Sequence, residues 1–375
     1  MRSKRIQNQI FIFHRYLGLG VGCIVAVIGI TGSLLVFQPN IEQFWVTQGF
    51  DPIIPQAQRI SIETAVSTVQ AAYKDLDLKP TTIKALPENN FYSVRLSDKK
   101  KRLDVFLNAY TGEILGDRTY EHTLMANLLE LHVSLFAGDM GTVITGIVAF
   151  LLLSLSLTGT ILWPGWRKLS TGFKIKLKAH PKRTNFDIHK VAGIIAAFFL
   201  CLTSFTGFCW NFYDWTTPLI YAVTFTKEPT DLTSTPIQGQ SPLGLDEILR
   251  RSDVALPGTI TTYIYPPTEP EEVFTIGKRY PSTPSGDGQS SVELDRYSGA
   301  VLRVWDERSL PLGDKVLNSF ESLHYGTFGG LPTRILYVFV GFAPIVLLVT
   351  GFVMWKHRRR EGISKTTSFF LAKRL

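Results

Sequence analysis

Hydrophobic positions along the chain gather in four long, nearly unbroken runs, which are separated by two long stretches of mixed polarity. The runs cover residues 16–37, 143–163, 191–212 and 335–355. Each is close to the ~20 apolar residues that a helix needs to cross the hydrocarbon core of a bilayer. Pro344 interrupts the last run, where a kink is expected. The pattern predicts a membrane protein with four transmembrane helices.

Lysine and arginine predict the direction in which these helices run. The net charge is +8, and the basic residues concentrate at the N-terminus, in the link 164–190 and in the tail 356–375. Such segments stay on the cytoplasmic side, so both termini are expected inside. The charge therefore needs no nucleic-acid partner. The predicted segments are, in order, 1–37, 38–142, 143–163, 164–190, 191–212, 213–334, 335–355 and 356–375, with 38–142 and 213–334 outside.

The first run is expected to remain in the protein as an anchor. It is longer than the apolar core of a secretion signal, and the segment FQPNIEQF that follows has no small-residue cleavage site. The lipid bilayer is therefore the first partner that the sequence predicts.

Comparison of the chain with itself predicts two tandem repeats. Aligning His14 with His189 matches a basic residue at the next position, a glycine four residues on and the glycine of a Thr-Gly pair eighteen residues on. Aligning His132 with His324 matches the preceding leucine, a later Thr-Gly pair and a tryptophan thirty-one residues on. Each repeat is therefore expected to be helix, outer domain, helix, and both run in the same direction.

Both outer stretches show the pattern of a small α+β unit. An amphipathic segment comes first, ISIETAVSTVQAAY in one and LGLDEILRRS in the other, and strand-like segments follow it. Asn108–Gly112 and Asp295–Gly299 are typical of hairpin turns, because each ends in glycine after Asn or Asp. The segment Pro281–Ser291 is predicted to be a mobile loop.

These residues resemble the PepSY-associated transmembrane family, whose members include iron-regulated, siderophore-reductase-like inner membrane proteins. The resemblance covers nearly the whole chain and rests on His14-Arg15-Tyr16-Leu17-Gly18, Leu131-His132, His189-Lys190 with Gly193, and the segment from Leu323-His324 to Arg334. It implies two PepSY-like periplasmic domains and a place in a bacterial inner membrane. For the best understood members it also implies b-type haem and reduction of ferric siderophores on the periplasmic side.

Four histidines occupy matching positions in the two repeats. Burying imidazole in a bilayer is costly, so a histidine that recurs near a span indicates a functional role. His14 and His189 begin the outward-running spans, whereas His132 and His324 precede the inward-running spans. Each pair is expected to face across the bundle as the two axial ligands of a haem iron, which gives two haems. The alternative is that these histidines only pack or form hydrogen bonds at the membrane interface.

Other polar residues have candidate roles around these pairs. Arg15 and Lys190 are placed to meet haem propionates on the cytoplasmic side, and Arg334 is a candidate on the outer side. Asp139 or Asp314 could orient an imidazole through its second ring nitrogen. The four Thr-Gly pairs are interpreted first as close helix-packing positions. Of the remaining histidines, His122 is expected on a helix that continues to His132, and His180 and His357 at a charged surface facing lipid headgroups.

Electron transfer is the function that this pattern favours. Electrons would enter from an unidentified cytoplasmic or membrane donor, pass both haems and reduce an outer acceptor such as a ferric siderophore, so the protein would act as a metal reductase. No flavin or nicotinamide fingerprint and no catalytic nucleophile is visible in the sequence. Two alternatives stay open, a non-redox PepSY binding or regulatory protein tethered to the membrane, and a transporter.

Overall fold

The computed structural model describes residues 2–86, 88–98, 101–236, 239, 241–283 and 288–372, with side chains from Lys4 to Arg359. The chain divides into two compact units, each of which is described by itself. The helical unit comprises Met1–Gln38, Leu128–Ile220 and Ser319–Leu375, and the sheet unit comprises Pro39–Asn127 and Tyr221–Asn318. The loop predicted at Pro281–Ser291 and the tail 356–375 fall partly outside the described residues.

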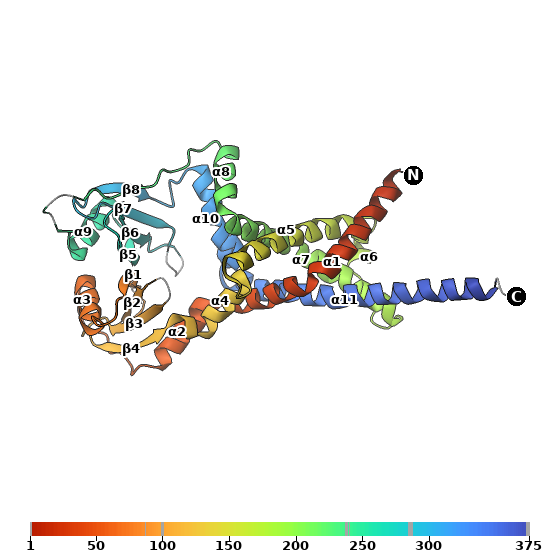
Figure 1. Cartoon of the computed structure of the whole chain (residues 1–375), viewed down its shortest axis with the longest axis horizontal. Helices are drawn as coiled ribbons and strands as arrows, with labels where there is room; N and C mark the ends of the chain where they lie inside the picture. The colour runs from red at the N-terminus through yellow and green to blue at the C-terminus, as the bar shows by residue number, and fades with distance from the viewer. Residues whose placement is uncertain are drawn as a thin grey trace. The chain divides into compact units, whose positions relative to one another are not determined.

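Among the described residues, four helices are long and apolar enough to cross a membrane. They are α1 (Arg2–Leu35), α5 (Gly138–Leu162), α7 (Pro181–Asn211) and α11 (Gly330–Ala372) (Figure 1). The four predicted runs lie on these helices, but α1, α7 and α11 extend well beyond them. Hydropathy marks the part of a helix that suits lipid, whereas the backbone hydrogen bonds continue into the polar flanks.

The four long helices form a closed ring in the helical unit. α1 packs against α5 and α11, and α7 packs against the same two helices. α1 and α7 are therefore diagonal partners, as are α5 and α11. The contact between α1 and α11 is close, because a Cβ added to Gly29 would lie 2.4 Å from the carbonyl oxygen of Gly341. Beside it the Ser33 hydroxyl donates to the Val338 carbonyl over 2.9 Å, so small residues set this crossing.

Two shorter helices lead into the second and fourth spans. α4 (Leu124–Ser134) ends before α5, and α10 (Leu312–Tyr325) ends before α11. Positive φ angles redirect the chain at both junctions, 53° at Leu135 and 59° at Phe136 in the first, and 70° at Gly326 in the second. The last turn of α4 carries His132 and that of α10 carries His324.

The sheet unit contains one antiparallel sheet in the order β4-β3-β2-β1-β5-β6-β7-β8. The sequence predicted two separate outer domains; in the structure their strands join, because β1 pairs with β5 at Ile83↔Ile264 and Lys84↔Tyr263. The strands are β1 (Lys79–Lys84), β2 (Phe91–Ser97), β3 (Arg102–Asn108), β4 (Ile114–Thr119), β5 (Ile260–Tyr265), β6 (Phe274–Arg279), β7 (Ser290–Leu294) and β8 (Val301–Trp305).

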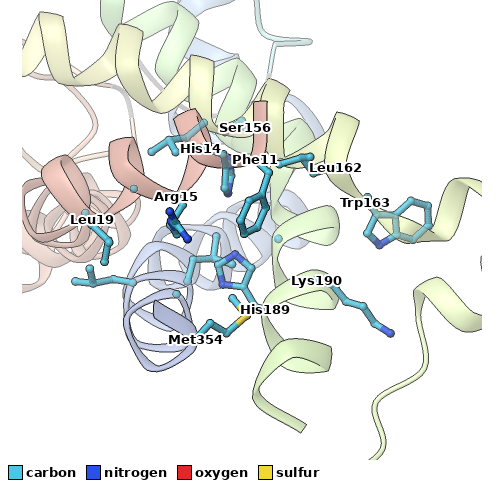
Figure 2. Close-up of a pocket in the computed structure, with 18 of the residues that line it drawn as sticks. Phe11, His14, Arg15, Leu19, Ser156, Leu162, Trp163, His189, Lys190 and Met354 are labelled. Atoms are coloured by element: carbon cyan, nitrogen blue, oxygen red, sulfur yellow. The ribbon is translucent and has the colours of Figure 1, made fainter. Parts of the chain in front are cut away.

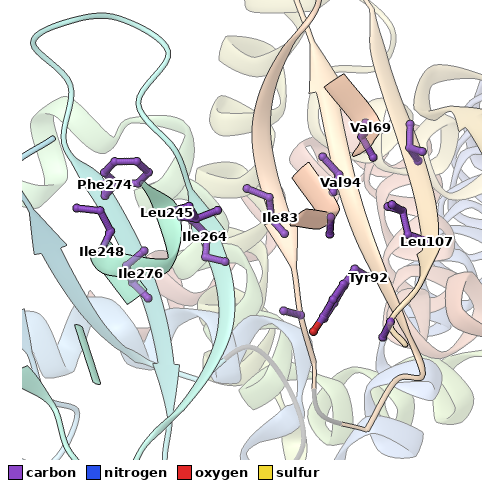
Figure 3. Close-up of a cluster of buried hydrophobic side chains, with 14 of the residues drawn as sticks. Val69, Ile83, Tyr92, Val94, Leu107, Leu245, Ile248, Ile264, Phe274 and Ile276 are labelled. Atoms are coloured by element: carbon purple, nitrogen blue, oxygen red, sulfur yellow. The ribbon is translucent and has the colours of Figure 1, made fainter. Parts of the chain in front are cut away.

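Two helices and the sheet share one hydrophobic core. α3 (Ile62–Ala72) and α9 (Leu245–Ala255) contribute Val69 and Ile248, which pack with strand residues such as Ile83 and Ile264 (Figure 3). Alternation along β2 and β7 buries every second side chain and so predicts which face meets the helices. The remaining short elements are α2 (Gln38–Gln48), η1 (Tyr120–His122), η2 (Pro164–Trp166), α6 (Leu169–Gly172), α8 (Tyr213–Val223) and η3 (Thr327–Gly329).

The N-termini of α3 and α9 cap each other. The backbone N–H of Glu63 donates to the Asp246 carboxylate over 3.3 Å, and the backbone N–H of Asp246 donates to the Glu63 carboxylate over 2.9 Å. A carboxylate at a helix N-terminus satisfies a free N–H and is attracted by the helix dipole. Each half of the chain therefore supplies the cap for the other half's helix.

Candidate functional site

The structure brings the four repeated histidines together as two pairs in the helical unit. His14 on α1 faces His189 on α7, with ring centres 6.5 Å apart and ring planes at 89°. His132 on α4 faces His324 on α10, with ring centres 6.3 Å apart and planes at 81°. Each pair thus joins one residue from each half of the chain. His14 and His189 lie on the diagonal helices α1 and α7, whereas His132 and His324 lie on the short helices α4 and α10.

These separations suit two axial ligands on one metal ion. A metal–imidazole nitrogen bond is about 2 Å long and the nitrogen lies about 1.1 Å from its ring centre, so two imidazoles on opposite sides of one ion have ring centres about 6.2 Å apart. Rings that were merely stacked would be much closer. Perpendicular rings in edge-to-face contact also have centres about 4.5–7 Å apart, so the spacing is compatible with one ion between the rings but does not by itself require it.

A threonine hydroxyl holds every one of the four imidazoles. The Nδ1 atom of His14 lies 2.9 Å from Thr158 Oγ1, and that of His132 lies 3.0 Å from Thr31 Oγ1. The corresponding distance is 2.8 Å in His189–Thr350 and in His324–Thr206. All four threonines belong to Thr-Gly pairs, which the sequence pattern alone favours as packing positions. The structure gives these pairs a second role, that of orienting the histidines.

The hydrogen bonds of these threonines fix which ring nitrogen carries the proton. A hydroxyl has one proton, and Thr206 donates it to the Leu202 carbonyl over 2.8 Å. Its oxygen must therefore accept from Nδ1–H of His324. His132 Nδ1 also lies 2.9 Å from the Ile28 carbonyl, which can only accept. The ring is thus protonated at Nδ1, and Nε2 keeps the lone pair that binds a metal.

The glycine of each Thr-Gly pair gives its histidine space. A Cβ added to Gly32 would lie 3.0 Å from Cε1 of His132, and one added to Gly159 would lie 3.1 Å from Cε1 of His14. The same Cε1 contact would be 3.3 Å at Gly207 with His324 and 3.6 Å at Gly351 with His189. The threonine therefore holds the ring while the glycine allows the helix backbone to approach it.

A cavity of about 650 Å³ surrounds the His14–His189 pair (Figure 2). This volume is in the range of sites that enclose a cofactor. Its walls are mostly apolar, from side chains such as Phe11, Leu155 and Leu347. The described residues that line it include four cationic side chains, Lys4, Arg15, Lys190 and Arg358, and no carboxylate. An apolar slot with cationic groups and two free imidazole nitrogens fits haem, a planar apolar ring with two carboxylates.

At the His132–His324 pair neutral imidazoles are favoured. Burial lowers the pKa of His132, and burial together with the neighbouring His132 lowers the pKa of His324 to about 3. Trp210 lies against the His324 ring, with ring centres 4.8 Å apart. Arg334, the candidate partner of a propionate at this end, donates to the Val36 carbonyl over 2.8 Å and lies over the Phe37 ring.

Other candidate residues lie apart from these contacts. His122 is in the short helix η1 and not on the predicted helix to His132, because α4 begins at Leu124. Asp314 accepts a hydrogen bond from the Tyr221 hydroxyl, whereas Nδ1 of His132 is bonded to Thr31 and the Ile28 carbonyl and that of His324 to Thr206. His180 caps the N-terminus of α7, where its Nδ1 accepts from the backbone N–H of Lys182 over 3.3 Å. Asp139 is exposed in the first turn of α5.

The two pairs mark opposite ends of α1. His14 lies on this helix and the His132 ring is held by Thr31 of the same helix. Seventeen residues separate positions 14 and 31, which at 1.5 Å per residue is about 25 Å along the axis. The pairs are therefore two separate sites, placed at two depths of the helix ring.

Fold and site together define a multi-pass membrane protein in which four long helices hold two pairs of facing histidines. The chain belongs to the PepSY-associated transmembrane family, since the family described as the PepSY-associated TM region matches residues 11–358. It is also similar to the uncharacterized protein PA4219 of Pseudomonas aeruginosa, with 27% identity over 265 residues. That match spans 63% of this chain and 64% of the relative.

Proposed function

We propose that this protein carries electrons across a bacterial inner membrane through two b-type haems, one at each histidine pair. The observation that carries the proposal is the set of four imidazoles, each fixed by a threonine at Nδ1 so that Nε2 is available. Histidines that only packed between helices would not all need to be protonated at Nδ1 with Nε2 left free. Bound haem would supply a one-electron carrier at each pair.

The chain is proposed to consist of two tandem repeats, helix–domain–helix, with both termini in the cytoplasm and the sheet unit in the periplasm. The lysine-rich and arginine-rich segments support this orientation. The ring of long helices and the strand order support the repeats, because each places the two halves in equivalent positions. In this orientation the His14–His189 pair is on the cytoplasmic side and the His132–His324 pair on the periplasmic side.

The protein's own residues then have distinct tasks. His14 and His189 would hold one haem, on the side of the cytoplasmic or membrane donor, and His132 and His324 would hold the other, on the side of the outer acceptor. One electron leaves the donor, and one ferric ion in the acceptor becomes ferrous, so the electrons balance.

A ferric siderophore is the proposed acceptor, on the ground of the family resemblance. Ferrous iron binds hard oxygen ligands less tightly than ferric iron does, so reduction would loosen the metal. The alternative is a tethered PepSY binding protein without redox chemistry.

A reduced-minus-oxidised absorption spectrum of the detergent-purified protein tests the proposal. We expect a low-spin b-type spectrum with two haems per chain, and one haem fewer in each of His14→Ala and His324→Ala. Reduction of a ferric chelate on the outer face of vesicles should cease in both variants. A folded, colourless protein from cells supplied with haem would overturn the proposal and favour the binding protein. Haem retained in both variants would refute the ligand assignment.

A further inference from the structure

The two cationic residues beside the cytoplasmic histidines are not equivalent, although they match in sequence. Arg15 follows His14 and Lys190 follows His189. Both line the cavity around the pair. The two side chains differ in their hydrogen-bond and ion-pair partners.

Arg15 has an unsatisfied guanidinium nitrogen. Its Nε is buried and has no hydrogen-bond partner among the described residues. The guanidinium lies over the rings of Tyr16, at 4.6 Å, and Phe11, at 5.5 Å. These rings orient the side chain but supply no negative charge. A buried donor without a partner is costly, which indicates that a ligand with an acceptor group belongs beside it.

Lys190 is compensated within the chain. Its Nζ lies 2.8 Å from the Asp187 carboxylate and donates to the Thr171 carbonyl over 2.9 Å. Asp187 is fully buried, and it also accepts from the backbone N–H of Lys176 over 3.2 Å. In Figure 2 the Lys190 chain extends away from the two imidazoles, whereas Arg15 lies beside them. The ammonium group is therefore occupied before any ligand binds.

The cause of the difference is one substitution between the halves. With His14 aligned to His189, the position of Asp187 is taken by Ile12 in the first half. Ile12 cannot pair with Arg15. The first half thus offers the cavity an uncompensated cation. In the second half the Asp187 carboxylate compensates Lys190 and also accepts from Nε of Arg183 over 3.2 Å.

We infer that Arg15 is the residue that binds a carboxylate of the cofactor, and that Asp187 withholds Lys190 from that role. Asp187 is then a positioning residue, which also removes one positive charge from the surroundings of the His14–His189 site. A positive charge near a haem favours its reduced form, because reduction adds an electron. Asp187 therefore keeps the midpoint potential of this haem lower than two free cations would. The inference rests on the proposed function, since it requires haem at this pair.

Potentiometric titration of the haem-loaded full chain, together with haem loss to excess apomyoglobin, tests the inference. The His14→Ala variant shows which transition belongs to this pair. We expect Arg15→Gln to lower its midpoint and to speed haem loss from it about tenfold or more, as for a lost charge-assisted hydrogen bond. Asp187→Asn should raise the midpoint. Asp187→Leu with Lys190→Met should leave it close to wild type, because that pair has no net charge.

Arg167→Gln is the matched control, since Arg167 is an exposed basic residue outside the cavity lining. It should change neither readout. Unchanged haem loss and midpoint in Arg15→Gln would overturn the inference, as would a double variant that shifts the midpoint as far as Asp187→Asn does. Those results would leave the haem itself in place. A preparation without haem would instead overturn the proposed function and this inference with it.

Discussion

Thr206 Oγ1 lies 2.8 Å from Nδ1 of His324, and the same hydroxyl donates its only proton to the Leu202 carbonyl. One side chain therefore decides both the direction of the imidazole and the nitrogen that is left to bind a ligand. Partners of this kind are ordinarily carboxylates or backbone carbonyls. Here the partner is a threonine, whose side chain is fixed by its hydrogen bond to a carbonyl of its own helix, α7.

Removing that hydroxyl should weaken the site. In Thr206→Val the Nδ1–H of His324 loses the hydroxyl and keeps only the Thr203 carbonyl as an acceptor, and we expect about 10–100-fold weaker haem binding at the His132–His324 pair. Loss of the hydroxyl also makes the ligand less basic, so the midpoint of that haem should rise. Thr206→Ser keeps the hydroxyl and should resemble the wild type. Haem titration and potentiometry give both quantities; equal behaviour of the Val and Ser variants would contradict the role of the hydroxyl.

Adding a methyl group beside an imidazole should have a similar outcome for a steric reason. In Gly32→Ala the new Cβ would lie 3.0 Å from Cε1 of His132. Overpacking of this kind costs ~1–3 kcal/mol, so haem content at the His132–His324 pair should fall. Gly20→Ala on the same helix is the control, since nothing lies within 4 Å of its added Cβ. A normal haem content in Gly32→Ala would show that the ring has room to move.

The crossing of α1 and α11 should depend on Gly29. A Cβ at this position would lie 2.4 Å from a backbone oxygen of α11, and the backbone cannot yield as a flexible side chain can. We expect Gly29→Ala to lower the stability of the helical unit by about 1–3 kcal/mol, seen as a lower midpoint of thermal unfolding in detergent. Gly20→Ala again provides the comparison. Equal unfolding midpoints would mean that the two helices can separate without cost.

The turn at Asp295 should make the sheet unit sensitive to acid. Burial alone would raise the pKa of Asp295, but hydrogen bonds from Ser298, Thr235 and Tyr297 outweigh burial and lower it below 3.8. A lowered folded-state pKa stabilises the fold above pH 3.8 and ceases to do so as the pH falls through the folded value. We expect Asp295→Asn to cost ~1–3 kcal/mol at pH 7 and progressively less below about pH 4.

The matching turn of the first half supplies the control for this prediction. Asn108 accepts from the backbone N–H groups of Tyr110, over 2.9 Å, and Thr111, over 3.3 Å. An amide does not titrate in this range, so this turn should hold at low pH, whereas Asn108→Asp should introduce acid sensitivity there. Thermal unfolding of the full chain at pH 7 and pH 3 measures both variants. An Asp295→Asn deficit that is equal at both pH values would exclude the electrostatic explanation.

Most of the local structure could be predicted from the sequence, because it depends on short-range patterns. The apolar runs locate the four long helices, and Ser61 caps α3 as its position suggests. Strand β1 was missed, since KPTTIK shows no clear alternation and contains Pro80. Its pairing with β5 was missed for the same reason, and with it the single eight-stranded sheet.

The candidate site was only partly accessible to such reasoning. Repetition of His14 and His189 indicates that they act together, but their partners come from other helices, and no local pattern assigns Thr158 to His14. The available signal was the repetition of Thr-Gly pairs, because the four pairs at matching positions of the two halves accompany the four repeated histidines. Asp187 gave no such signal. Its effect depends on its ion pair with Lys190 and on the hydrogen bond from Lys190 to the Thr171 carbonyl, which only the fold reveals.

Because each histidine pair takes one residue from either half of the chain, a single half would contain no complete ligand set. Two copies of such a half, side by side and running in the same direction, would contain both. On the proposed repeat organisation, fusion of two such copies would join both ligand sets in one chain and would allow Ile12 and Asp187 to differ. Fusion is what allows two equivalent surfaces of a symmetric pair to acquire different charges.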